Sequence, residues 1–175
     1  MRGILCALVM MLASPASALN LDAEFSNIDG GTHRLADWAG QPVLVVNTAS
    51  LCGFTPQYNA LQKLHDRFSD RGLVVLAVPS DNFAQELKDD DAVKEFCEVN
   101  YNLTLPMTGI TDVKGPNAHP FYKSLAATGF EPNWNFNKVL IGPEGKLVAT
   151  YRSRVSPTSR RITDEIERLL DHPES

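Results

Sequence analysis

The chain has 175 residues, of which 43% are hydrophobic and 21% are charged, and its formal net charge is −5. This length suits a single domain. The acidic balance argues against nucleic acid or an anionic membrane surface as a partner.

The first 18 residues predict a secretory signal peptide. Met1-Arg2 is a basic start, Ile4 to Ala13 is a short apolar run, and Ala16-Ser17-Ala18 is a small-residue cleavage site. The run is too short to span a bilayer, which needs about 20 apolar residues. An N-terminal anchor and a buried first helix are the alternatives. We expect cleavage after Ala18, a mature domain of residues 19–175 without a stable membrane anchor, and export across the inner membrane to the periplasm.

The number of cysteines in the mature protein depends on this cleavage. Cys6 leaves with the signal peptide, and the mature chain keeps Cys52 and Cys97. In an oxidising compartment, two cysteines either form one disulfide or act as two reactive thiols.

The first half of the mature chain predicts a β-hairpin followed by a βαβ unit. Residues 20–35 place the turn Asp29-Gly30-Gly31 between short apolar segments. Residues 43–46 and 73–78 are continuous apolar runs, typical of strands in a parallel sheet that is covered on both faces. Between them, apolar residues recur at helical spacing after Thr55-Pro56, with Thr55 as the expected N-cap.

Cys52 lies in the loop between the first of these strands and the helix. In open α/β sheets, loops at the carboxyl ends of strands form ligand sites. A thiol just before a helix also lies near unpaired backbone N–H groups and the positive end of the helix dipole, and both favour the thiolate. Cys52 is therefore a candidate nucleophile.

The second half predicts further helices and a second hairpin. Asp89-Asp90-Asp91 starts a helix that carries Cys97, and residues 117–125 form another short helix. Residues 139–141 and 148–151 flank a Gly-Pro-Glu-Gly turn, as in an antiparallel hairpin.

A last amphipathic helix is expected to start at Ser156-Pro157. A βαβ unit followed by a hairpin and a final helix is the thioredoxin-like plan. The expected fold class is therefore α/β, a thioredoxin-like fold with an N-terminal β-hairpin and an inserted helix.

Three segments resemble motifs of the glutathione peroxidase family. Residues 47–55 (NTASLCGFT) are similar to its peroxidatic-cysteine loop, residues 78–83 (VPSDNF) to its second motif, and residues 134–138 (WNFNK) to its third. The motifs occur in the family's order, and the resemblance covers residues 20–171. It implies a thiol-dependent peroxidase that reduces hydrogen peroxide and organic hydroperoxides through a sulfenic acid on Cys52.

The resemblance also implies which side chains assist Cys52. Peroxide reduction needs donors that stabilise the sulfur anion and the leaving oxygen. Trp134 offers an indole N–H and Asn135 an amide NH₂. By position in the second motif, Asn82 takes the remaining amide role, although the family commonly has glutamine there and cysteine at the position of Ser80. Asparagine is one methylene shorter, and a turn-shaping role is the alternative for Asn82.

Cys97 is a possible resolving cysteine. A sulfenic acid must condense with a second thiol, and thioredoxin-dependent members of the family carry that thiol on the helix after the second motif. Cys97 lies one residue before this position, so a buried core cysteine is the alternative. The co-substrate is glutathione or a thioredoxin-like protein, and a secreted location favours a Cys52–Cys97 disulfide over direct attack by a small thiol.

The remaining expectations concern cofactors, assembly and rival classes. No cofactor is implied, and His33, His65, His119 and His172 show no metal-ligand spacing. The short segment 115–134 resembles monomeric members of the family, whose sites admit bulky lipid hydroperoxides. The alternatives are a secreted thioredoxin-like thiol-disulfide protein, which would need a second cysteine at position 55, and a peroxide sensor without sustained turnover.

Overall fold

The computed structural model describes residues 18–172. The signal-peptide prediction therefore falls outside the described residues, apart from Ala18. Among residues 18–172, no helix is long and apolar enough to cross a membrane.

A four-stranded mixed sheet forms the centre of the molecule, with the strand order β4-β3-β5-β6. β3 (Val43–Thr48) and β4 (Val74–Pro79) run parallel to each other. β5 (Lys138–Ile141) pairs antiparallel with β3 on one side and with β6 (Leu147–Tyr151) on the other. The predicted βαβ unit and the second hairpin are thus confirmed.

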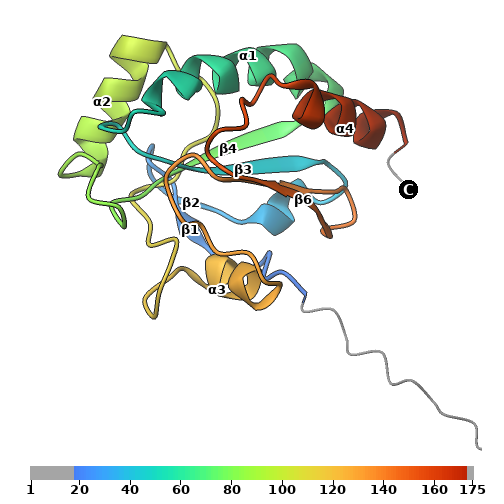
Figure 1. Ribbon diagram of the computed structural model, residues 1–175, viewed down its shortest axis with the longest axis horizontal. Coiled ribbons are helices and arrows are strands. Elements are labelled where there is room, and N and C mark those ends of the chain that lie inside the picture. The colour runs from blue at the N-terminus through green and yellow to red at the C-terminus, as the bar shows by residue number, and fades with distance from the viewer. Residues whose placement is uncertain (1–17, 173–175) are drawn as a thin grey trace, which may run out of the picture.

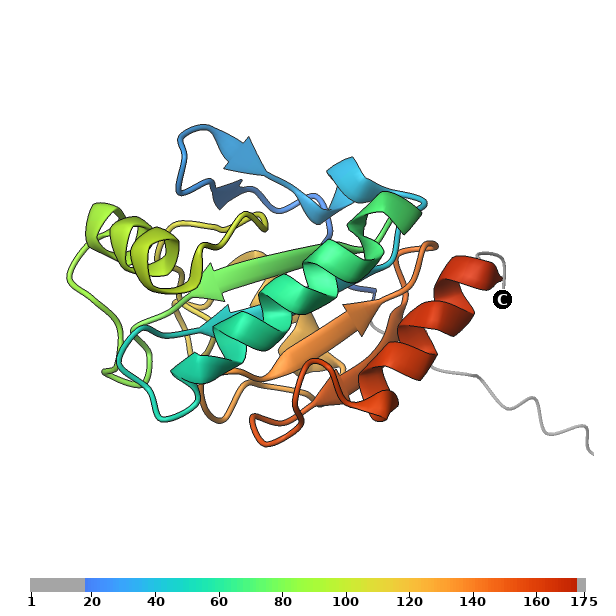
Figure 2. The ribbon, with the colours of Figure 1, turned by 90° about the horizontal axis from the view of Figure 1, so that it is seen from above.

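Helices cover both faces of this sheet (Figure 1). α1 (Tyr58–Phe68) and α4 (Arg160–Asp171) lie on one face, and α3 (Pro120–Ala127) lies on the other. The inserted helix, α2 (Asp90–Tyr101), lies at the end of the sheet where β3 and β4 finish (Figure 2). This arrangement confirms the thioredoxin-like fold.

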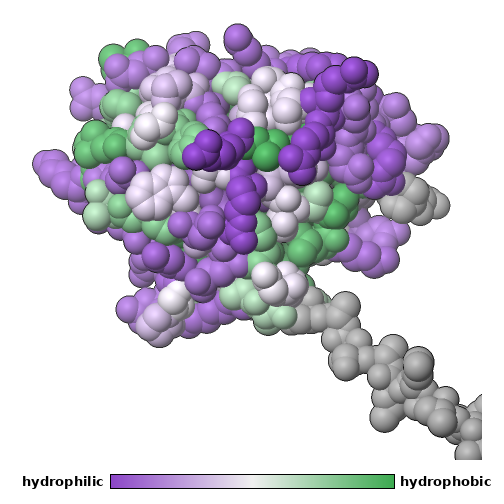
Figure 3. Space-filling view, in the orientation of Figure 1, coloured by the Kyte–Doolittle hydropathy of each residue, from purple (hydrophilic) through white to green (hydrophobic). Residues whose placement is uncertain are grey.

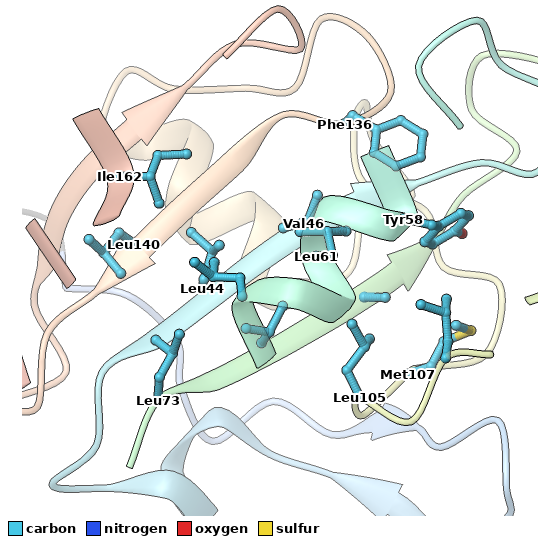
Figure 4. Packing of buried hydrophobic residues seen from close by; sticks show 14 of the residues in the cluster. Leu44, Val46, Tyr58, Leu61, Leu73, Leu105, Met107, Phe136, Leu140 and Ile162 are labelled. Carbon is cyan, nitrogen blue, oxygen red and sulfur yellow. The ribbon is translucent and has the colours of Figure 1, made fainter. Parts of the chain in front are cut away.

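The two faces of β3 bury alternate residues. Leu44 and Val46 belong to the hydrophobic cluster beneath α1 and α4, where Figure 4 shows them beside Leu61. Val43 and Val45 belong to the cluster on the α3 side. Because a strand has a period of two, a continuous apolar run buries both of its faces, and this pattern is the one that identified β3 in the sequence.

The N-terminal hairpin is present but short. β1 (Phe25–Ser26) pairs antiparallel with β2 (Thr32–His33). Gly30 and Gly31 in its turn have φ values of 97° and 80°, a left-handed conformation that glycine adopts without strain. A 3-10 helix, η1 (Leu35–Trp38), leads from this hairpin to the sheet.

The start of α1 differs from the prediction. Thr55–Gln57 form a 3-10 helix, η2, and α1 follows with Gln57 as its N-cap. The Thr55 hydroxyl donates to the carbonyl of Ala49 at 2.8 Å and accepts the amide N–H of Cys52 at 3.0 Å. The N-cap prediction for Thr55 is therefore wrong, because this hydroxyl closes the Cys52 loop instead. A further 3-10 helix, η3 (Ser69–Arg71), follows α1.

The starts of the other three helices agree only in part with the starts predicted from the sequence. Asp89 caps α2 by accepting the amide N–H of Ala92 at 2.9 Å, as an acid-started helix requires. α3 begins at Pro120 and not at residue 117, because Pro120 takes the first helical position after a His119 cap. α4 begins at Arg160, four residues after Ser156, since residues 156–159 form a turn.

Candidate active site

Cys52 lies in a tightly closed loop at the carboxyl end of β3. The loop is closed by the Thr55 hydroxyl, and the amide N–H of Phe54 donates to Cys52 Sγ at 3.4 Å. Only 8% of the residue is exposed. A sulfur that accepts a backbone N–H gains stabilisation of its negative charge, so the loop suits a reactive thiol.

Trp134 and Asn135 lie in the loop that leads into β5. The Trp134 carbonyl accepts N–H groups from Asn47 Nδ2 at 3.0 Å and from Asn137 Nδ2 at 2.8 Å. The Trp134 residue is 40% exposed and its ring lies 5.4 Å from that of Phe83, whereas Asn135 is fully buried. The third motif thus presents one aromatic side chain at the surface and one amide inside.

Gln85 connects these two loops, although the sequence analysis did not single out this residue. Its backbone carbonyl accepts the amide N–H of Leu51 at 2.9 Å, and its Oε1 accepts an N–H from Asn135 Nδ2 at 3.0 Å. Beside it, Glu86 Oε1 accepts the amide N–H of Ser50 at 3.0 Å. The Cys52 loop, the segment after the second motif and the third motif therefore meet at one end of the sheet.

Asn82 makes its contacts elsewhere. Its Nδ2 donates to the Asp112 carboxylate at 2.7 Å, and its Oδ1 accepts the amide N–H groups of Val113 at 2.6 Å and Lys114 at 3.2 Å. No hydrogen bond within residues 18–172 joins its side chain to Cys52 or Asn135. These contacts give Asn82 the turn-shaping role and do not support the expected amide role.

Cys97 lies on the inner side of α2 and is 1% exposed. Burial raises the pKa of its thiol to about 12, so it is protonated in this conformation. Cys52 and Cys97 are both free thiols. Asn135 is joined to the Cys52 loop through Gln85. Cys97 and Cys52 both belong to the hydrophobic cluster beneath α1 and α4.

A buried lysine, Lys138, is hydrogen-bonded to the segments that flank these loops. Lys138 is fully buried, and its Nζ donates to Gln57 Oε1 at 2.6 Å and to the carbonyls of Val155 at 2.6 Å and Ser153 at 3.3 Å. Burial lowers the pKa of the Lys138 amine to about 7. Because Gln57 ends η2 and Ser153 Oγ donates to the carbonyl of Asn135 at 2.6 Å, Lys138 ties both loops together.

Within residues 18–172, no group of three or more His, Cys, Asp or Glu side chains lies close enough to hold a metal ion. Fold and site together define the class: a thiol-based oxidoreductase built on a thioredoxin-like fold, with Cys52 at the end of a central strand.

Comparisons with known proteins identify the family within this class. The family model described as glutathione peroxidase matches residues 21–126. The hydroperoxy fatty acid reductase gpx1 of Synechocystis sp. is 43% identical over 155 residues, which cover 82% of this chain and 90% of that protein. The glutathione peroxidase-like peroxiredoxin GPX5 of Chlamydomonas reinhardtii is 38% identical over 152 residues, covering 83% and 93%.

A solved structure, Trgpx in its apo form, agrees with a TM-score of 0.70 at 30% identity, and the match covers 90% of this chain and 99% of that one. The chain belongs to the glutathione peroxidase family and is a thiol-dependent peroxidase.

Proposed function

We propose that Cys52 is the nucleophile of this peroxidase. The observation that carries the proposal is its position: the sulfur accepts the N–H of Phe54 in a loop that is bound, through Gln85, to Asn135. The thiolate is the form of cysteine that attacks, and a backbone donor stabilises it. We propose that a peroxide reaches the sulfur through this loop, where the residue keeps 8% of its surface exposed.

The reaction proceeds by displacement at oxygen. The Cys52 thiolate attacks one peroxide oxygen, so that an S–O bond forms while the O–O bond breaks. The sulfur is oxidised to a sulfenic acid, and the peroxide is reduced by the same two electrons. The other oxygen leaves as hydroxide or alkoxide and takes up a proton, giving water or an alcohol.

Trp134 and Asn135 assist by donating hydrogen bonds to the developing anion. The indole N–H of Trp134 is a donor that cannot accept, and one N–H of Asn135 Nδ2 remains after the bond to Gln85. Donors that are already held in place stabilise charge as it develops, without reorganisation. The bonds from Asn47 and Asn137 to the Trp134 carbonyl hold this loop in place.

A dione probe that reacts only with sulfenic acids tests the proposal. After one equivalent of hydrogen peroxide, we expect the adduct on Cys52 in a Cys97→Ser variant, where no second thiol competes with the probe. An adduct-free Cys52 together with continued peroxide consumption would refute the assignment.

The surface around the site supports organic hydroperoxides as substrates besides hydrogen peroxide. Leu51, directly before Cys52 in the chain, is 60% exposed, and Trp134 is 40% exposed. The Lys114 ammonium lies 4.4 Å from the Phe83 ring centroid. An acyl chain would contact the two apolar side chains. The name of the Synechocystis relative indicates that it reduces hydroperoxy fatty acids. A Leu51→Ser variant should lose kcat/KM for a fatty acid hydroperoxide and keep it for hydrogen peroxide.

For the second half of the cycle we propose that Cys97 resolves the sulfenic acid. Attack by the Cys97 sulfur would form a Cys52–Cys97 disulfide and release water, and a thioredoxin-like protein would then reduce the disulfide. Support comes from the position of α2, at the same end of the sheet as the Cys52 loop (Figure 2). Because Cys97 is buried, α2 must open locally first.

Mass spectrometry after one equivalent of peroxide tests this route. An intramolecular disulfide is the expected product. A lasting sulfenic acid on Cys52 beside a reduced Cys97 would instead assign the resolving step to a small thiol such as glutathione.

Location and assembly complete the proposal. The composition of residues 1–18 supports secretion to the periplasm, which N-terminal sequencing of the mature protein tests by finding Leu19 first. A monomer is supported by the surface in Figure 3, where apolar residues form separate groups among polar ones on the face drawn.

A further inference from the structure

The guanidinium of Arg152, the residue that follows β6, contacts the loop of residues 130–137 at several points. Its Nη1 donates to the Glu131 carbonyl at 2.9 Å and to Asn133 Oδ1 at 3.1 Å. The same nitrogen donates to Asn137 Oδ1 at 3.1 Å. These acceptors lie before and after positions 134 and 135 in the chain. One side chain therefore holds both ends of the segment that carries the proposed donors.

An aromatic ring fixes the position of this guanidinium. The Cζ atom of Arg152 lies 4.3 Å from the centroid of the Phe130 ring, and Phe130 is buried. A planar guanidinium can lie over an aromatic face and still donate hydrogen bonds in its own plane. Arg152 is itself an exposed residue, so the ring beneath it limits the positions that its Nη1 can take.

Arg152 also determines which way the side-chain amide of Asn137 faces. Because Asn137 Oδ1 accepts from the guanidinium, Nδ2 is left to donate, to the Trp134 carbonyl at 2.8 Å and to Ser153 Oγ at 3.1 Å. A flipped amide would place two donors against each other at Arg152. Ser153 Oγ in turn donates to the Asn135 carbonyl at 2.6 Å. The backbone of both proposed donor residues is therefore held by hydrogen bonds that start at Arg152.

The backbone between these contacts needs support. Phe136 has a φ of 60°, a left-handed conformation that a residue with a side chain adopts only where its surroundings hold it. Its ring is fully buried, and its amide N–H donates to the Asn47 carbonyl at 2.6 Å. Asn47 holds this turn from the side of β3, and Arg152 holds it from the side of β6.

We propose that Arg152 is a positioning residue for the reaction with peroxide. By holding the loop of residues 130–137, it keeps the indole N–H of Trp134 and the amide of Asn135 where they donate to the developing anion. Within residues 18–172, the guanidinium forms hydrogen bonds only with this loop, so it acts on the reaction through the loop. This role rests on the proposed function of Cys52, Trp134 and Asn135.

A substitution that keeps an unbranched apolar stem tests the role. Arg152→Met removes the guanidinium and leaves a side chain that still covers Phe130. We expect its second-order rate constant with hydrogen peroxide, measured by stopped flow, to fall about tenfold, which is part of the 10²–10³-fold that a fixed donor is worth. Arg154→Met is the matched control, because Arg154 is an exposed arginine two positions further on that forms no hydrogen bond or ion pair within residues 18–172. Its rate should stay within about twofold of the parent.

The pH profile of this rate constant separates positioning from the positive charge of Arg152. The rate rises with pH as the Cys52 thiol loses its proton and then reaches a plateau. Loss of positioning lowers the plateau and leaves the midpoint of the rise unchanged. Loss of a charge that favours the thiolate raises the midpoint and leaves the plateau unchanged. A raised midpoint with a plateau within about threefold of the parent would overturn the proposal.

Trp134 itself reports whether Arg152 holds the loop. The chain has two tryptophans, so in a Trp38→Phe background Trp134 is the only one. Its time-resolved fluorescence anisotropy measures motion of the ring on the nanosecond timescale. Adding Arg152→Met should give Trp134 a faster and larger loss of anisotropy than adding Arg154→Met. Equal anisotropy decays in the two variants would refute the positioning role.

The same variants distinguish failure of this proposal from failure of the proposed function. If the parent and Arg154→Met form no sulfenic acid on Cys52, the proposed function fails, whatever Arg152 does. If both form it and Arg152→Met reacts with peroxide within about threefold of the parent, only the role of Arg152 is overturned.

Discussion

The side-chain amide of Asn47 donates to the carbonyl oxygen of Trp134 at 3.0 Å, although 87 positions separate the two residues. Asn47 Oδ1 accepts the amide N–H of Asn137 at 3.1 Å, and its backbone carbonyl accepts that of Phe136 at 2.6 Å. Asn47 is 2% exposed. The strand that leads to Cys52 therefore also holds the loop that carries Trp134 and Asn135.

Asn47→Ala should lower both stability and activity. The substitution leaves the buried amide of Asn137 without its side-chain partner, which costs about 1–3 kcal/mol. Urea denaturation measures the loss. Asn100→Ala is the control, because Asn100 is exposed on α2 and its amide only bonds the carbonyl of Phe96; it should change stability by less than about 0.5 kcal/mol. Equal midpoints for the two variants would contradict the account.

Trp134→Phe tests the indole donor. Phenylalanine keeps an aromatic ring against Phe83 and removes the N–H. Losing one fixed donor typically costs about 10²–10³ in rate. If the rate constant with peroxide stays within about threefold of the parent, a change of less than 1 kcal/mol, the donor role of Trp134 is wrong.

The lowered pKa of Lys138 predicts that the stability of the protein depends on pH. Its pKa of about 7 in the folded protein lies below the ordinary value of 10.5, because burial disfavours the ammonium form. Above pH 7 the unfolded chain therefore binds more protons at this position than the folded one. Stability should rise with pH at up to about 1.4 kcal/mol per unit from this group.

The comparison of Lys138→Met with the parent isolates this effect. Both are unfolded with urea between pH 7 and 8.5, below the range where tyrosines lose their protons. The stability of the parent relative to the variant should increase with pH across this window. A relative stability that is flat or decreases would show that Lys138 stays charged, held by its three oxygen acceptors.

The assembly prediction is a monomer. Light scattering of the mature protein should give a mass close to that of a single chain at micromolar concentrations. A stable tetramer would contradict this expectation.

The sheet and helices could be predicted because their signals are local. The apolar run 43–46 identifies a doubly buried strand, and Asp89 identifies a helix start. Lys138 was the exception within the sheet. A lysine is typical of a strand boundary, yet Lys138 belongs to β5, where its buried Nζ donates to Gln57 and to the carbonyls of residues 153 and 155.

The site could be predicted only as far as the motifs reach. Asn135 is joined to the Cys52 loop through Gln85, and the place of Gln85 depends on the left-handed turn at Ala84, which no sequence pattern indicates. Asn82 was assigned by position alone. Its contact with Asp112, 30 positions away, exists only in the folded chain.

The most direct test of the central claim is a single-turnover measurement of peroxide consumption. Reduced protein is mixed with excess hydrogen peroxide and no added thiol, and the peroxide lost per protein molecule is counted. The account predicts that the Cys97→Ser variant consumes its first equivalent as fast as the parent, while Cys52→Ser, which changes one atom, consumes none. Rapid loss of one equivalent in Cys52→Ser would contradict the assignment of Cys52 as the peroxidatic nucleophile.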